Sequence, residues 1–146
     1  MRNNKEIVIR YVEKPAREKD NADVLIRWFC EALGLSKEDE KNSIEEKMLK
    51  KFIYAALKDR GISSGELDFG KPVPRSTVIY HLNRFVDAGL IVKRGRRYYL
   101  RSIDMAGVIK ELEYDMDREI RRMLDMAEEL NRIILKSANR RRNPSG

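Results

Sequence analysis

The sequence contains very few of the residues that most catalytic and metal sites require. Its 146 residues include one cysteine, Cys30, one histidine, His81, and no glutamine. A single cysteine excludes a disulfide within the chain and is typical of proteins from a reducing compartment, so we expect a cytoplasmic location. Cys30 falls beside the apolar face of a predicted helix. This favours packing over redox sensing, and the sequence alone leaves both roles open.

Sequence patterns for catalysis, cofactors and membrane insertion are also missing. The chain has no glycine-rich phosphate loop, no nucleophile elbow and no spacing of metal ligands. His81 alone cannot form a zinc site, because such sites take several ligands. No apolar run approaches the roughly 18 residues of a transmembrane helix, and charges interrupt residues 1–14 where a signal peptide would be apolar. We therefore expect no enzymatic activity, no metal, no other cofactor and no membrane association.

Positive charge is concentrated in one segment of the chain. The formal net charge is +7, and residues 71–102 hold eight basic residues against one acidic residue, Asp87. This segment therefore accounts for the whole excess. A basic excess confined to one region predicts a surface that attracts nucleic acid. The basic residues are Lys71, Arg75, Arg84, Lys93, Arg94, Arg96, Arg97 and Arg101.

The same segment predicts a helix followed at once by a tight β-hairpin. Apolar residues recur at helical spacing from residue 78 to Gly89, a residue that favours the left-handed conformation after a helix end. Residues 90–93 and 97–101 then alternate as two strands joined through residues 94–96, with Tyr98 and Leu100 facing the core. The polar side of the helix carries Ser76, Thr77, Tyr80 and Arg84, and Arg75 and His81 flank it. Because His81 lies close to the edge of the core, contact with a phosphate and packing are both open to it.

The runs Ser76-Thr77-Val78, Tyr80-His81-Leu82 and Ala88-Gly89-Leu90-Ile91 resemble the recognition helix and wing of winged helix-turn-helix regulators. The nearest likeness is to the ArsR-like and PadR-like groups of bacteria and archaea, over residues 43–102. The resemblance implies that the helix enters the major groove of double-stranded DNA and that the wing lies against its backbone. The thiolate clusters of metal-sensing ArsR-like repressors are absent from this sequence. The residues expected to contact DNA are Arg75, Ser76, Thr77, Tyr80, His81, Arg84, Lys93, Arg94, Arg96 and Arg97.

The sequence departs from this family between residues 62 and 74. Ile62 and Ser63 resemble the short first strand, and Ser64 is expected to cap a second helix. Pro72 and Pro74 forbid continuation of that helix, because proline lacks an amide hydrogen and clashes with the preceding turn. The second helix is therefore predicted to be truncated, with Leu67 and Val73 as buried anchors on either side.

Residues 1–42 are predicted to form an N-terminal helical appendage. A strand is expected at residues 6–12 and a helix at residues 21–33, capped by Asp20 or Asn21 and ended by Gly34. The polar residues 36–42 form the linker. A capping box of Ser43 and Glu46 then opens a helix that runs to about residue 60. The residues expected inward are Val24, Leu25, Trp28, Phe29, Ala32 and Leu33 in the first helix, and Ile44, Met48, Phe52, Ile53, Ala56 and Leu57 in the second.

Residues 103–136 complete the prediction as a long helix that starts at Met105 after the cap Asp104 and ends near Lys136. Its apolar residues recur at heptad spacing, which indicates a coiled-coil seam of a homodimer. Packing against the N-terminal helix is the alternative. Residues 137–146 are too polar to fold and are expected to be a disordered basic tail. The residues of the predicted dimer interface are Ile109, Leu112, Met116, Ile120, Met123, Ala127, Leu130 and Ile134.

The expected fold is thus mainly α with a small β-hairpin wing: a winged helix-turn-helix domain with an N-terminal helical appendage and a long C-terminal dimerisation helix. The expected function is that of a dimeric transcription regulator that binds double-stranded DNA. The alternative is a winged helix that docks to proteins of the transcription machinery. Docking modules usually lack a basic excess on the helix and wing, so the charge favours DNA. The sequence does not identify a small-molecule effector.

Overall fold

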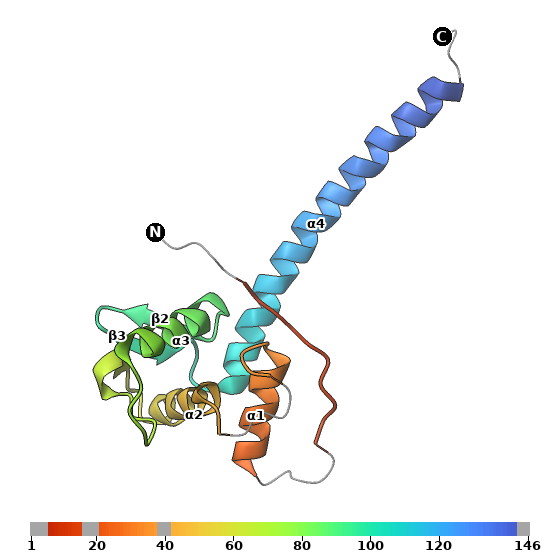
Figure 1. Cartoon of the computed structure of the whole chain (residues 1–146). Helices are drawn as coiled ribbons and strands as arrows, with labels where there is room; N and C mark the ends of the chain where they lie inside the picture. Colours follow the sequence, from red (N-terminus) through yellow and green to blue (C-terminus); the bar gives the residue numbers. More distant parts are fainter. Residues whose placement is uncertain (1–5, 16–20, 38–41, 143–146) are drawn as a thin grey trace. The chain divides into compact units, whose positions relative to one another are not determined.

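The computed structural model describes residues 6–15, 21–37 and 42–142, and it is mainly helical with a small antiparallel sheet (Figure 1). The chain divides into two compact units, Met1–Glu111 and Leu112–Gly146. The predicted mainly α fold with a hairpin is therefore confirmed at this level. The elements are α1 (Ala22–Ala32), α2 (Ile44–Leu57), β1 (Ile62–Ser63), the 3₁₀ turn η1 (Ser64–Glu66), α3 (Arg75–Asp87), β2 (Ile91–Arg94), β3 (Arg97–Leu100) and α4 (Met105–Arg142).

The sheet has the strand order β1-β3-β2, with both pairings antiparallel. The hairpin begins and ends close to its predicted limits, with Arg94 paired to Arg97 across a two-residue loop. Gly95 opens that loop with φ of 62°, a conformation that glycine adopts at little cost. Tyr98 and Leu100 point into the core as predicted, with exposed fractions of 4% and 7%.

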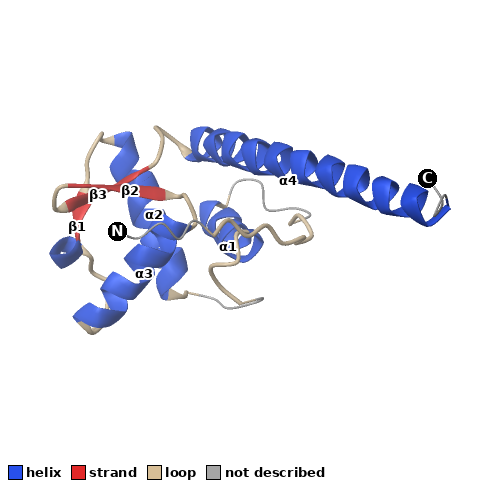
Figure 2. Cartoon of the chain, turned by 90° about the horizontal axis from the view of Figure 1, so that it is seen from above, coloured by secondary structure: helices blue, strands red, loops and turns tan. Residues whose placement is uncertain are grey.

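The core of the first unit lies between the sheet and the helices that pack on it (Figure 2). Because the buried side chains come from elements far apart in sequence, closing this core fixes α3 against both α2 and the hairpin. The largest side chains that are fully buried are Met48, Leu49 and Phe52 of α2, Leu82 and Phe85 of α3, Leu90 and Ile91 at the start of the hairpin, Val108, and Cys30 of α1.

Helix α1 begins as predicted, and its buried face agrees with the predicted one only in part. The Asn21 side chain accepts hydrogen bonds from the amides of residues 23 and 24, at 3.0 and 3.3 Å. The buried residues are Ile26, Cys30 and Ala32, whereas Leu25 is 39% exposed. Ala32 and Leu33 are buried as predicted, and Val24, Trp28 and Phe29 are half-buried, so the predicted stripe was wrong for Leu25 and missed Ile26. Ion pairs from α1 to α2 turn the side bearing Cys30 towards α2, so a neighbouring helix, rather than periodicity alone, selects the buried face.

Residues 6–15 are extended but form no strand, so the strand predicted at residues 6–12 is wrong. Their backbone bonds to the ends of helices instead. The amide of Glu6 donates to the carbonyl of Asp87 at 3.0 Å, and the amide of Arg10 donates to the carbonyl of Ala32 at 2.7 Å. The indole of Trp28 also donates to the carbonyl of Val12 at 3.2 Å. Unpaired carbonyls at helix C-termini thus replace the strand ladder that β-branched residues suggested.

Helix α2 starts at the predicted cap, where Ser43 Oγ accepts from the amide of Glu46 at 3.1 Å. The carboxylate of Glu46 bonds to Arg27 of α1 at 2.8 Å, a contact that the capping box did not predict. The helix ends at Leu57, earlier than expected, and Asp59 follows in the left-handed conformation with φ of 51°. Leu57 is therefore 71% exposed rather than inward, while Leu49 is fully buried.

The second helix is reduced to the single turn η1, in agreement with the predicted truncation. Its N-cap position is occupied by Ser63 rather than Ser64, without a hydrogen bond from the side chain. The expected anchors Leu67 and Val73 are half-buried, and Phe69 between them is 4% exposed. Phe69 therefore provides the hydrophobic anchor on this segment, and its carbonyl accepts from Lys47 Nζ at 3.0 Å.

Helix α4 is longer than predicted, and residues 137–142 of the expected disordered tail belong to it. Residues 143–146 lie outside the described part. The Asp104 carboxylate accepts from the amide of Gly107 at 2.8 Å, which confirms the predicted cap. Alanine and arginine are good helix formers, so the basic residues after 136 extend the helix at little cost. Among the described residues, no helix combines the length and apolar character that crossing a membrane requires.

Candidate nucleic-acid interface

Helix α3 has a buried face and an opposite face of exposed polar side chains. Pro74 occupies the N-cap position, and the helix buries Val78, His81, Leu82 and Phe85. Proline before a helix is tolerated because the first amides have no intrahelical partner. The predicted site residues Arg75, Ser76 and Tyr80 are exposed and Thr77 is half-exposed.

His81 does not belong to this exposed face, contrary to its inclusion among the predicted DNA contacts. Its exposed fraction is 9%, and its Nδ1 lies 3.2 Å from a carboxylate oxygen of Glu45. The imidazole also meets the ring of Tyr80 edge-on, with 5.2 Å between the ring centres. His81 is thus positioned to connect α3 to α2 and to support the exposed Tyr80 from behind.

Arg84 is also engaged within the protein. Its Nη2 donates to the carbonyl of Gly34 at 3.2 Å, and its Nη1 lies 3.5 Å from the same Glu45 oxygen that His81 approaches. The guanidinium carbon lies 5.8 Å from the centre of the Tyr80 ring. Because its polar atoms face Gly34 and Glu45, this side chain is better placed to hold Tyr80 than to contact a base.

Glu45 is the acid that connects these side chains, and sequence reasoning missed it. It lies in the first turn of α2, where the helix dipole favours a negative charge, and it is 8% exposed. The signal that was available is the spacing of His81 and Arg84, which puts two nitrogen donors on one side of α3, one turn apart.

The hairpin presents basic side chains that are steadied by aromatic rings. Lys93 Nζ lies 5.6 Å from the centre of the Tyr98 ring, and the Arg94 guanidinium carbon lies 5.5 Å from that of Tyr99. Cation–π contacts of this kind orient a charged group without neutralising it. Arg96 lies in the loop and is exposed.

Arg97 and Arg101 differ from these three because they contact the protein. Arg97 Nη1 lies 3.0 Å from a carboxylate oxygen of Glu66 and donates to the carbonyl of Gly61 at 3.1 Å. Arg101 donates to the carbonyl of Gly89 at 3.4 Å and lies 3.8 Å from Glu111. The basic excess predicted from sequence therefore contains two groups, one used for internal contacts and one directed to solvent.

The solvent-directed group is the candidate interface. Within the described ranges, no acidic side chain is within ion-pair distance of its members, and all are exposed. Of the predicted contacts, Arg84 and Arg97 belong to the internal group because each contacts other residues of the protein, and His81 is buried. The solvent-directed cations are Lys71, Arg75, Lys93, Arg94 and Arg96.

Cys30 and the acidic residues of the described ranges are further candidates for a site. The Cys30 thiol is fully buried, and its burial, followed by the charges of Glu46, Glu45 and Glu31, raises its pKa well above the usual range. A protonated, inaccessible thiol is neither a nucleophile nor a redox sensor. The described residues contain no group of three or more His, Cys, Asp or Glu side chains that could hold a metal ion.

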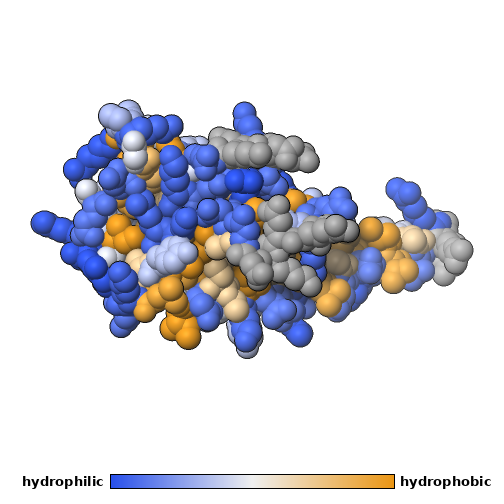
Figure 3. Space-filling view, turned by 90° about the horizontal axis from the view of Figure 1, so that it is seen from below, coloured by the Kyte–Doolittle hydropathy of each residue, from blue (hydrophilic) through white to orange (hydrophobic). Residues whose placement is uncertain are grey.

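The predicted dimer interface lies on α4 and is exposed along most of its length. Ile109 is 36% exposed and Met116 is half-buried, whereas Leu112 is only 3% exposed. All described residues from 117 to 141 are exposed. Figure 3 shows hydrophobic side chains interspersed with hydrophilic ones on the surface of this helix. Large apolar side chains with 55% to 67% of their surface exposed are Ile120, Met123, Leu124, Met126, Leu130, Ile133, Ile134 and Leu135.

Comparison of the chain with protein-family models, with curated proteins and with solved structures finds no match.

Proposed function

We propose that this protein is a dimeric transcription regulator of the winged helix-turn-helix class that binds double-stranded DNA. The observation that carries the proposal is the pairing of two adjacent elements. Helix α3 exposes hydrogen-bonding side chains, and the hairpin that follows it exposes three cations, Lys93, Arg94 and Arg96, without acidic partners among the described residues. Exposed cations beside a polar helix face are what phosphate contact and groove reading require together.

The proposal assigns different tasks to the two elements. The hairpin, acting as the wing, binds phosphates through Arg94 and Arg96, and these contacts are independent of sequence. Helix α3, acting as the recognition helix, reads base edges in the major groove through Arg75, Thr77 and Tyr80. Arg84 and His81 position Tyr80 from the protein side instead of contacting bases, since both face Glu45.

Dimerisation through α4 completes the proposal. Apolar side chains exposed at heptad spacing on α4, such as Met123, Ala127 and Leu130, would be buried against a second copy. Ion pairs within α4, such as Arg122–Glu119 and Arg132–Glu129, lie on the same stretch of this helix. A two-fold dimer presents two recognition helices to two half-sites, about 34–36 Å or a multiple of that apart.

A titration of fluorescent genomic DNA fragments and random DNA tests the base-reading part of this proposal. We expect Tyr80→Ala to weaken binding to the genomic fragment that the native protein binds most tightly by about 1–3 kcal/mol per half-site. Binding to random DNA should change much less. Tyr114→Ala is the matched control, because Tyr114 is 67% exposed on α4 and Tyr80 is 58% exposed on α3. Equal losses on both DNAs would contradict base reading by Tyr80. No DNA binding by the native protein would favour the docking-module alternative.

A further inference from the structure

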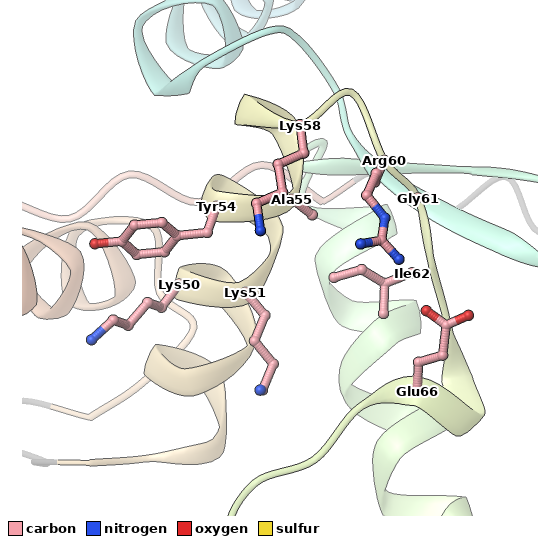
Figure 4. A pocket seen from close by; sticks show the side chains of 9 residues that line it. All are labelled: Lys50, Lys51, Tyr54, Ala55, Lys58, Arg60, Gly61, Ile62 and Glu66. Carbon is pink, nitrogen blue, oxygen red and sulfur yellow. The ribbon is translucent and has the colours of Figure 1, made fainter.

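A pocket of about 450 Å³ lies between α2 and the segment that carries β1 and η1 (Figure 4). Its apolar surface comes from Ala55, Ile62 and the ring of Tyr54, with Gly61 at the wall. The volume falls in the range typical of sites for small molecules. The remaining lining residues are Lys50, Lys51, Lys58, Arg60 and Glu66.

Positive charge dominates the rim of this pocket. Lys50 Nζ lies 2.8 Å from a carboxylate oxygen of Asp23, and this contact raises the pKa of the lysine. The negative charge of Asp23 offsets the positive charge of Lys50 at this end of the pocket. Lys51, Lys58 and Arg60 have no ion pair in the described part of the chain, and Glu66 is the only acid among the lining residues. Figure 4 places Tyr54 and Lys50 at the end of the pocket farthest from Glu66. Three cations against one carboxylate leave the pocket basic.

We propose that this pocket binds a small molecule with an apolar body and one anionic group. The apolar body would cover Ala55 and Ile62, where it loses contact with water. The anionic group would lie between Lys58, the C-cap residue of α2, and Arg60, two residues further on. Neither half of such a ligand is sufficient: a neutral apolar molecule leaves the cations unused, and a bare anion leaves the apolar wall exposed to water.

The pocket is connected to the hairpin through Arg97. The same guanidinium nitrogen that bonds to the carbonyl of Gly61 lies 3.0 Å from Glu66, and both residues line the pocket. Ile62 also pairs with Tyr98 of β3. A bound anion repels the Glu66 carboxylate and weakens its pairing with Arg97, which becomes available to a DNA phosphate. This coupling rests on the proposed function, whereas binding in the pocket does not.

Binding is tested on the full chain with naphthalene-1-sulfonate as the probe, followed by amide chemical shifts. We expect the changes in amide chemical shift to centre on Ala55, Gly61 and Ile62. Arg60→Glu should weaken the affinity for the probe at least tenfold. Lys110→Glu, which reverses an exposed charge on α4, is the control and should bind like the native protein. Equal binding of neutral 1-naphthalenemethanol, equal binding of inorganic phosphate, or shifts centred elsewhere would each overturn the assignment.

The coupling is tested by DNA titrations with and without the sulfonate. We expect the probe to tighten DNA binding about two- to fivefold, the range for one exposed ion pair. Glu66→Gln should give the same gain without the probe and should abolish the response to it. Because coupling between two ligands is reciprocal, DNA should tighten sulfonate binding by the same factor. Sulfonate binding without any DNA binding would support the pocket and overturn the coupling together with the proposed function. DNA binding that ignores bound sulfonate would overturn the coupling alone.

Discussion

Replacement of Glu45 by alanine would remove the carboxylate that two side chains of α3 approach. The Glu45 carboxylate lies 3.2 Å from His81 and 3.5 Å from Arg84, and its side chain is 11% exposed. Without it, His81 remains buried, and Arg84 keeps the Gly34 carbonyl and the ring of Tyr80 as neighbours but faces no carboxylate among the described residues. We therefore expect Glu45→Ala to loosen α3 from α2 and to reduce the free energy of unfolding.

The expected loss lies between two limits. Breaking a fully buried ion pair by removing one partner costs about 3–5 kcal/mol, whereas an exposed pair contributes at most about 1 kcal/mol. The His81 side chain is 11% exposed and that of Arg84 is 32% exposed, so one contact is buried and the other is partly screened by solvent. We expect a loss of about 2–3 kcal/mol, or a decrease in Tm of about 8–12 °C for a unit of this size.

Urea unfolding followed by circular dichroism measures this loss directly. Glu128→Ala, an exposed change on α4, is the control and should fall within about 0.5 kcal/mol of the native protein. The double variant Glu45→Ala/Arg84→Ala should lose less than the sum of the single variants by roughly 1 kcal/mol, because both remove the same contact. An unchanged stability for Glu45→Ala, or strict additivity with Arg84→Ala, would refute the role given to this carboxylate.

Three further predictions concern the thiol, the sheet and the dimer. Burial raises the pKa of Cys30, so its contribution to the free energy of unfolding should be fully present below about pH 8.5 and fall by up to about 1.4 kcal/mol per pH unit above it. In urea unfolding, Cys30→Ala should remove this dependence on pH. A dependence that persists unchanged in the variant would assign it to other groups. Gly61→Ala would put a methyl group 2.5 Å from the ring of Tyr99, so we expect the free energy of unfolding, measured by thermal unfolding, to fall by about 1–3 kcal/mol. An unchanged free energy would mean that the ring moves aside freely. Met123→Asp with Leu130→Asp should convert a dimer to a monomer in sedimentation, because charges buried in an apolar interface are costly. The native protein should be a dimer at about 50 μM, a concentration above the dissociation constant of a stable interface. A native protein that sediments as a monomer there would contradict the predicted dimer interface.

The elements predicted correctly are those that local chemistry determines. Asn21, Ser43 and Asp104 can cap a helix wherever the chain folds, and each one accepts the expected amide hydrogen bond. Glycines that follow α1 and α3 have positive φ, as expected for the ends of helices. The alternation of Tyr98 and Leu100 likewise follows from strand geometry alone. These features need no knowledge of distant residues.

The errors concern residues whose environment is set by distant parts of the chain. The acidic first turn of α2 is typical of an exposed helix start, yet Glu45 and Glu46 are buried because α3 and α1 supply cations to them. Arg84 looked like a DNA contact because helical spacing places it beside His81 but does not show that Glu45 of another helix lies against both. For the same reason the site could be predicted as a basic region, but not divided into internal and solvent-directed cations.

The most direct test of the proposed function is the salt dependence of DNA binding by the variant Arg94→Ala/Arg96→Ala. Each arginine that contacts a phosphate contributes about 0.9 to the slope of log affinity against log salt concentration, so two residues in each half of a dimer contribute roughly 4. We expect the variant to lose affinity for specific and random DNA alike, and the slope of its log affinity against log salt concentration to decrease by about this amount. The control variant Lys110→Ala should keep the affinity and the slope of the native protein. An unchanged slope and affinity would contradict the proposal that this hairpin binds the DNA backbone.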